Sequence, residues 1–174
     1  MNNTEIEHII RACVGITGRE EVVVIGSQAI LASFDVSRLP ADATVSIEAD
    51  VLFFNDEDQR LADLIDGAIG ELSQFHETFG IYAQGVDETI AILPPGWQDR
   101  LVRLSNRNTG GGAGLCLDPY DLCAAKLFAL REKDIRYVKS LLDSGIIERK
   151  VLIERITSTP DHEQKKRTAL RFLG

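Results

Sequence analysis

The sequence lacks the features that mark secreted, membrane-spanning and zinc-binding proteins. Its three cysteines, Cys13, Cys116 and Cys123, are odd in number, and no CxxC motif or Cys/His cluster accompanies them. This excludes a disulfide framework and the usual zinc sites. No apolar run approaches the roughly 20 residues that span a bilayer, and the acidic N-terminus does not resemble a signal peptide. We therefore expect a cytoplasmic protein with buried free thiols and no membrane segment.

Several catalytic signatures are also missing. No GxSxG or comparable motif indicates a nucleophilic triad, and the glycine-rich stretch 106–114 lacks the GxxxxGK[ST] pattern of a P-loop. The net charge of −8 argues against broad, nonspecific binding to nucleic acid, which requires a basic surface. The one basic segment, 162–171, is interpreted as a solvated helix face, with an RNA-binding arm as the alternative.

What is present fits an ordinary globular domain. The 174 residues are 44% hydrophobic and 26% charged, and a chain of this length can bury about two-thirds of its unfolded surface in one core. We expect one domain over 1–174, with an α/β core at 1–117 and a helical part at 118–174. The predicted fold class is α/β (α+β), a small mixed sheet flanked by helices.

Hydrophobic periodicity predicts the elements of the first part. Helical spacing covers 4–17, a β-branched run at 21–26 predicts a buried strand, and a helix follows over 27–34. Strict alternation predicts a strand over 45–54, and an amphipathic helix follows over 56–72. We expect a loop over 73–80, a hairpin of strands 81–86 and 89–93, a strand within 98–105, a flexible loop over 106–114 and a last strand at 115–117.

The second part is predicted to be helical. Asp118 is a good N-cap and Pro119 a good first helical residue. One long helix should extend from there to Gly145, with a bend near 131–134. Two shorter helices are expected over 147–157 and 160–173.

Two acidic residues carry the strongest chemical signal. Glu48 and Asp50 stand two positions apart on the alternating strand, so both carboxylates project from one face about 6–7 Å apart. Acidic residues are depleted in strands, and adjacent like charges repel each other. A divalent cation such as Mg²⁺ explains the pair, because carboxylates are its preferred ligands. The alternative is an acidic strand that faces solvent, which Leu52 and Phe54 on the same face disfavour.

Three further positions accompany the acidic pair. Gly26 and Ser27 stand where a strand turns into a helix, a place where backbone and hydroxyl groups can hold a phosphate. Lys126 lies in a stretch that is apolar nearly all round, so its ammonium group either extends to solvent or lines a cleft. Arg131 and Asp134 are spaced for a simple helix ion pair.

Together these motifs resemble the minimal nucleotidyltransferase-like branch of the DNA polymerase β superfamily, a group distantly similar to abortive-infection toxin nucleotidyltransferases. VVVIGSQAIL supplies the Gly-Ser turn, and SIEADVLFF supplies the paired acids. The segment DPYDLCAAKLFALREKDIRYVKSLLDSGII resembles the helical block of the family. The similarity spans roughly 20–148, and the helical block is its most distinctive part. It implies a bacterial protein that uses a nucleoside triphosphate (NTP) as substrate.

The resemblance assigns roles to these residues. Glu48, Asp50 and a third acid would hold Mg²⁺ or Mn²⁺, with Gly26 and Ser27 on the distal phosphates. Lys126 would bind the nucleotide and neutralise phosphoryl charge. For the third acid, two alternatives stay open: Asp87 reaches the site, or Gln84 takes that position and leaves it short of a carboxylate.

Two functions follow from these alternatives. With an intact site, the protein transfers a nucleoside monophosphate from an NTP to an unknown acceptor, as the enzyme of a toxin–antitoxin pair. With a degraded site, the same fold acts as a regulatory module that binds a partner protein encoded nearby. A metal-dependent hydrolase ranks below both, because the histidines that such sites use are missing.

Overall fold

The computed structural model describes all residues 1–174, and its centre is a five-stranded mixed sheet with the order β3-β2-β1-β5-β4. Strand β1 is antiparallel to β2 and parallel to β5, β2 is parallel to β3, and β4 is antiparallel to β5. The strands are β1 (Glu21–Val24), β2 (Glu48–Leu52), β3 (Tyr82–Gly85), β4 (Val102–Leu104) and β5 (Ala113–Cys116).

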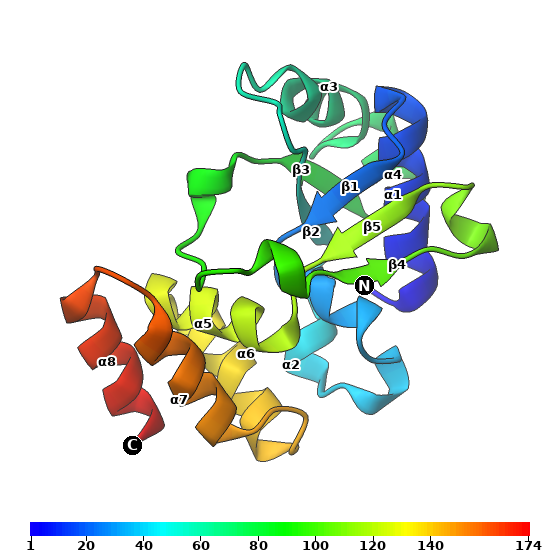
Figure 1. Cartoon of the computed structure of the whole chain (residues 1–174). Helices are drawn as coiled ribbons and strands as arrows, with labels where there is room; N and C mark the ends of the chain where they lie inside the picture. The colour runs from blue at the N-terminus through cyan, green and yellow to red at the C-terminus, as the bar shows by residue number, and fades with distance from the viewer.

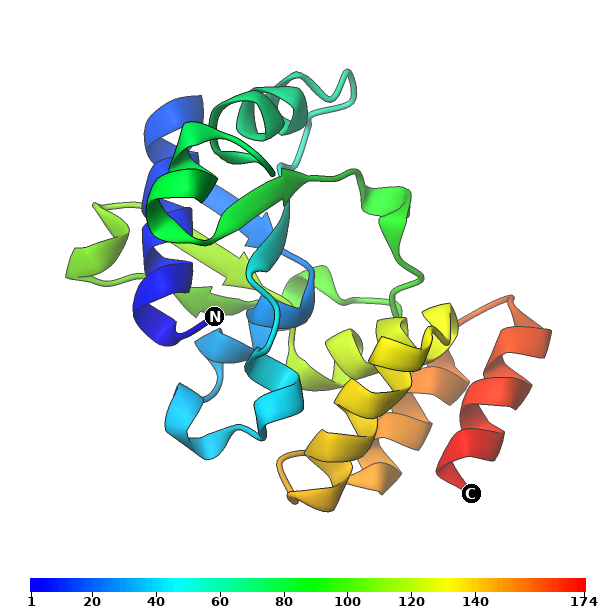
Figure 2. The same cartoon turned by 180° about the vertical axis from the view of Figure 1, so that it is seen from behind.

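The helices fall into two groups (Figures 1 and 2). Helices α1, α3 and α4 lie beside the sheet, whereas α5 to α8 gather at the end where β1 and β5 finish. None of them combines the length and apolar composition that a bilayer crossing needs. The α-helices are α1 (Asn3–Thr17), α2 (Ala41–Thr44), α3 (Arg60–Ile69), α4 (Gln74–Phe79), α5 (Pro119–Ala129), α6 (Glu132–Asp143), α7 (Arg149–Ser158) and α8 (Glu163–Leu173). Short 3₁₀ helices are η1 (Ser27–Ala32), η2 (Val36–Arg38), η3 (Glu88–Ile90), η4 (Gln98–Arg100) and η5 (Arg107–Thr109).

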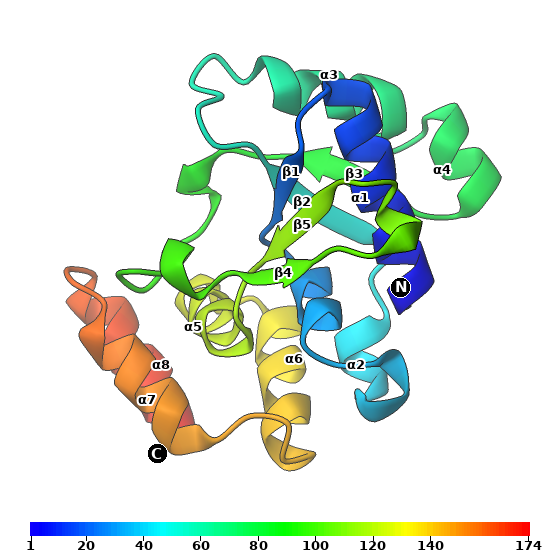
Figure 3. The same cartoon turned by 45° about the vertical axis from the view of Figure 1, so that its right-hand side comes forward.

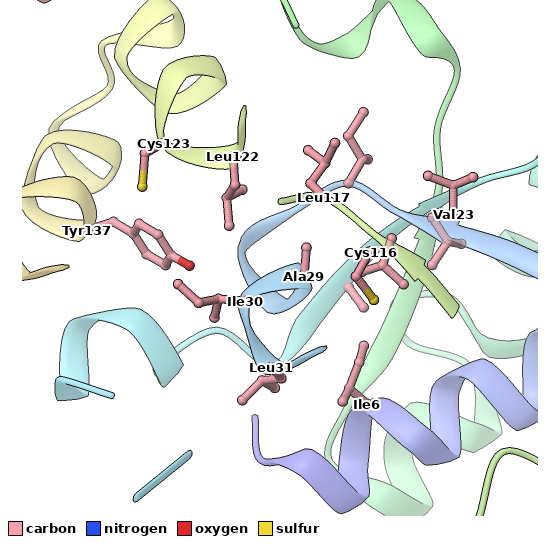
Figure 4. Packing of buried hydrophobic residues seen from close by; sticks show 14 of the residues in the cluster. Ile6, Val23, Ala29, Ile30, Leu31, Cys116, Leu117, Leu122, Cys123 and Tyr137 are labelled. Carbon is pink, nitrogen blue, oxygen red and sulfur yellow. The ribbon is translucent and has the colours of Figure 1, made fainter. Parts of the chain in front are cut away.

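One hydrophobic core joins both groups of helices to the sheet. Figure 4 shows its middle, where Ile6 of α1, Cys116 of β5, Ile30 of η1 and Tyr137 of α6 belong to one continuous layer of side chains. All three cysteines are buried and free, as predicted, and burial raises the pKa of Cys13 and Cys116 to about 12. The core therefore fixes the helical part against the sheet, and the cleft described below lies between them.

Several sequence predictions need correction. The strand predicted over 45–54 is paired only over Glu48–Leu52, and Val45 and Ile47 outside it are 77% and 45% exposed. The predicted loop 73–80 is helix α4, which Ser73 caps at its start through a bond from the His76 backbone N–H. The helix predicted over 27–34 is the short 3₁₀ helix η1.

The predicted hairpin of 81–86 with 89–93 is also wrong. Strand β3 forms, but it pairs in parallel with β2, and the following residues form η3 after the Asp87 side chain caps it. The segment between β3 and β4 leaves the sheet, runs toward α5 and returns (Figures 1 and 3). Likewise, the long C-terminal helix is two helices, because Leu130 adopts a left-handed conformation with φ 55°.

Candidate functional site

The acidic pair lies on β2, and both residues line the cleft between the sheet and the helical part. Glu48 stands opposite Tyr82 of β3, and Asp50 stands opposite Gln84. Burial raises the pKa of Asp50, and the positive charges of Lys126 and Lys133 partly offset this rise. The pKa of Glu48 is also raised, first by burial and then by the charge of Asp50. The two carboxylates are thus close enough to repel each other and partly shielded from water, an environment that favours a bound cation.

Gly26 lies directly against one of these carboxylates. A Cβ atom added at Gly26 would stand 1.8 Å from Oδ2 of Asp50, so no other residue fits without displacing the acid. Its φ of −83° is open to any residue, which means that space, and not backbone conformation, requires the glycine. The glycine turn and the acidic strand are therefore one site.

Ser27 and Lys126 form the second half of the site. Lys126 Nζ donates to Ser27 Oγ at 2.9 Å and to Asp134 Oδ1 at 3.1 Å. It also lies 4.3 Å from the ring centroid of Tyr137, whose hydroxyl donates to the Ser27 carbonyl oxygen. Burial lowers the pKa of Lys126, and the Asp134 charge opposes this effect. The lysine is held rigidly beside Ser27 and does not extend into bulk water, since its side chain is only 10% exposed.

Asp134 connects this lysine to the helix break. Its side chain is fully buried, and it accepts a bond from Arg131 Nε at 2.5 Å as well as from Lys126. The predicted i,i+3 pair therefore exists, but its aspartate also orients the cleft lysine. Sequence reasoning missed this contact, because Lys126 and Asp134 are eight positions apart and only the reversal at Leu130 brings them together.

A cleft of about 580 Å³ contains all of these groups. Its lining comes from the irregular segment that follows β3, from residues 42–46 in and after α2, and from α5, α6 and the start of α8. Its polar lining consists of Gly26, Ser27, Asp42, Ser46, Glu48, Asp50, Gln84, Thr89, Lys126, Arg131, Lys133, Tyr137 and Lys165. The sequence analysis did not single out Lys133 and Lys165 as site residues, because exposed helical lysines are common and carry no spacing signal.

Asp87, one of the two alternatives for the third position, caps the short helix η3 that follows β3. Its carboxylate accepts bonds from the Thr89 backbone N–H and hydroxyl, and Asp87 does not line the cleft. Gln84 occupies the position beside Asp50 instead. No group of three His, Cys, Asp or Glu side chains is positioned to hold a metal ion. The site thus offers the two carboxylates of β2, a neutral amide, a hydroxyl and a fixed lysine, and Asp42 adds a further carboxylate to the lining of the cleft.

This donor set suits a phosphate ester with a divalent cation. Carboxylate and amide oxygens match the ligand preference of Mg²⁺ and Mn²⁺, and a hydroxyl with a buried ammonium group matches phosphate oxygens. The cleft volume is within the range of small-molecule sites. A family model described as "nucleotidyltransferase of unknown function (DUF6036)" matches residues 4–171. Neither the curated proteins nor the solved structures contain a match to the chain.

Proposed function

Because the chain belongs to this family of nucleotidyltransferases of unknown function, we propose that it transfers a nucleoside monophosphate from an NTP to a hydroxyl-bearing acceptor, with Mg²⁺ or Mn²⁺ as cofactor. The observation that carries this proposal is the contact of Gly26 with the Asp50 carboxylate. The two carboxylates of β2, the hydroxyl of Ser27 and the ammonium group of Lys126 therefore share one cleft, which supports a common role in binding the cation and the triphosphate.

The residues present fit a divalent cation. Glu48 and Asp50 would hold it, because a cation between them relieves the repulsion and desolvation that raise the pKa of both groups. When bound, it would supply charge neutralisation at the phosphate oxygens of the transition state. A third carboxylate would strengthen the site. Asp87 would supply it only after a rearrangement of the segment around 87–92.

The chain's own groups bind and orient the nucleotide. Ser27 and Lys126 would donate to oxygens of the triphosphate. Asp134 opposes the lowering of the Lys126 pKa by burial, and Asp134 and Tyr137 hold the ammonium group beside Ser27. In the transfer, the acceptor oxygen forms a bond to the α-phosphorus. The bond between the α-phosphorus and the oxygen that bridges to the β-phosphate breaks, and pyrophosphate leaves. The hydroxyl proton goes to a carboxylate of the pair or to water. A fixed donor aimed at the developing charge contributes about 100-fold to 1000-fold in rate.

A thermal-shift panel of the four NTPs with Mg²⁺ or Mn²⁺ tests the proposal. Ligand at about 100 times its dissociation constant adds about 2.7 kcal/mol of stability, which raises the Tm of a domain of this size by roughly 5–10 °C. Glu48→Gln and Asp50→Asn should abolish the metal-dependent part of the shift. The matched control is Glu154→Gln, which removes an exposed charge on α7 outside the cleft. A flat wild-type response to every NTP would overturn the proposal.

One observation favours a second candidate function. Gln84, and not an acid, stands beside Asp50, so the site is short of one carboxylate. In this candidate the protein binds metal and nucleotide without turnover and acts through a partner protein, as in a toxin–antitoxin pair. Release of pyrophosphate separates the two: the transferase releases it when the acceptor is added, and the regulatory module does not. In the second case, Gln84→Asp should create turnover where the wild type has none.

A further inference from the structure

The basic residues of the chain are distributed very unevenly. All six lysines, and 12 of the 19 basic residues, lie in 118–174, together with only 9 of the 27 acidic residues. The helical part therefore has a net charge of +3, and residues 1–117 have a net charge of −11. The cleft runs along this boundary, with the acidic pair on one side and lysines on the other.

Two of the cleft lysines have no role in the nucleotide site described above. Lys133 of α6 and Lys165 of α8 both line the cleft, and both are exposed. Neither forms an ion pair or a hydrogen bond with the protein. By contrast, Lys126 and Arg131 share Asp134, and Lys166 pairs with Glu163. Two positive charges without a protein partner thus face the cleft from different helices.

Their position matters because the acceptor must approach two carboxylates. Lys133 is near enough to lower the pKa of both Glu48 and Asp50. The segment with Thr89 and Ile90 also lines the cleft, and Ile90 is 60% exposed. An anionic acceptor would be repelled by the acidic pair and by a bound triphosphate. Two free ammonium groups on flexible stems can offset that repulsion, since lysine binds phosphate as an adaptable point charge.

We propose that Lys133 and Lys165 bind phosphate groups of the acceptor, so that the molecule receiving the nucleotidyl group is a phosphate-bearing alcohol. This inference rests on the proposed transferase function and names the class of its second substrate. Two kinds of molecule carry both a phosphate group and a free hydroxyl group: the hydroxyl end of a nucleic-acid strand and a small phosphorylated alcohol. Broad binding of nucleic acid is not implied, because only two free lysines serve the cleft and the molecule as a whole is acidic.

The experiment measures binding without any NTP. A fluorescein-labelled, eight-nucleotide single-stranded RNA is titrated with the full chain at about 50 mM and about 200 mM salt, and fluorescence anisotropy is recorded. Glycerol 3-phosphate serves as the small competitor. The variants are Lys133→Met, Lys165→Met and the double variant, which keep the apolar stem and remove the charge. Lys150→Met is the matched control, because Lys150 is exposed and unpaired but lies on α7 outside the cleft.

We expect each cleft substitution to weaken binding several-fold and to reduce the slope of log affinity against log salt by about 0.7. Lys150→Met should bind like the wild type. Weak displacement by glycerol 3-phosphate supports a nucleic-acid end, and full displacement supports a small phosphorylated acceptor. The inference is overturned if the wild type binds neither probe, or if the double variant binds both as the wild type does. Failure of the proposed transferase function is read separately, as a flat Mg–NTP thermal shift of the wild type.

Discussion

At the scale of single residues, Gly26 ties the two halves of the site together. It can approach Asp50 only because it has no Cβ, and the same closeness positions Ser27 beside Lys126. Asp134 has a comparable role on the other side, where one buried carboxylate serves both Lys126 and Arg131. Substitutions at such residues should affect stability and ligand binding together, since the same contacts provide both.

Gly26→Ala is expected to lower the free energy of unfolding by about 1–3 kcal/mol, the usual cost of overpacking. Its Cβ would clash with the Asp50 carboxylate, so Mg–NTP stabilisation should disappear as well. Gly15→Ala is the control, because no atom lies within 4 Å of an added Cβ there and alanine favours α1 by about 0.5–1 kcal/mol. Urea unfolding measures both. If Gly26→Ala keeps wild-type stability and binding, the close contact is not what shapes the site.

Asp50→Asn should reveal the electrostatic strain of the acidic pair. Because the pKa of Asp50 is raised in the folded state above its ordinary value of 3.8, the folded protein binds this proton more tightly than the unfolded chain does. Stability therefore falls as the pH rises from about 4 through the raised pKa. In a chelator, we expect the variant to become progressively more stable than the wild type across that window. Urea titrations at several pH values measure the difference, and a wild type that gains on the variant contradicts the assignment.

At the scale of elements, the break between α5 and α6 brings residues 131–134 to the cleft, where Arg131 and Lys133 line it. Leu130 is left-handed at φ 55°, and the reversal brings Asp134 to Lys126. Leu130→Val should lower the free energy of unfolding by about 1–2 kcal/mol, because a β-branched residue is strained in this conformation. Leu64→Val, at an exposed position within α3, should cost only about 0.5 kcal/mol or less through helix propensity. Equal costs would show that the break is not strained.

Elements with strong local signals could be predicted from the sequence. The alternation around Glu48 and Asp50, the turn at Gly26 and the N-cap at Asp118 each reflect chemistry within a few residues, and each element is present. The predictions that failed concern contacts between residues that are distant in the sequence. Strand β3 pairs with β2 and not with residues 89–93, and no local pattern shows which neighbour a short strand will choose.

The residues of the site divide in the same way, into those with a local sequence signal and those without one. Glu48, Asp50, Gly26, Ser27 and Lys126 were all named from the sequence, and the structure brings them into one cleft. The roles of Lys133, Lys165 and Asp134 were not foreseen, because they arise from how helices pack and not from spacing. The loop predicted over 73–80 is helix α4, although Ser73 and Gly80 provide local capping signals for a helix.

At the scale of the whole molecule, a buried ion-pair network joins the β3–β4 segment to the helical part. Arg100 contacts both carboxylate oxygens of Asp121 at 2.8 and 3.0 Å, and Arg155 of α7 contacts the same acid at 3.3 Å. The Asp121 side chain is fully buried, so removing a partner leaves an incompletely compensated charge. We therefore expect the sheet, the β3–β4 segment and the helices to unfold as one cooperative unit.

Arg100→Leu is expected to cost about 3 kcal/mol, whereas Arg103→Leu, which breaks the exposed pair with Glu21, should cost about 0–1 kcal/mol. Trp97, the only tryptophan, is 8% exposed and packs near Phe54. Its fluorescence and the helical circular dichroism should therefore report one coincident transition in both variants. Separate transitions would contradict a single domain over 1–174.

The central claim is that one cation and one triphosphate occupy the cleft between β2 and α5. Crystals grown with Mn²⁺ and a non-hydrolysable NTP test it most directly through the anomalous signal of manganese. We predict a peak within about 2.0–2.3 Å of carboxylate oxygens of Glu48 and Asp50, with the phosphates against Ser27 and Lys126. A manganese peak away from this pair, or phosphates bound elsewhere, would contradict the account.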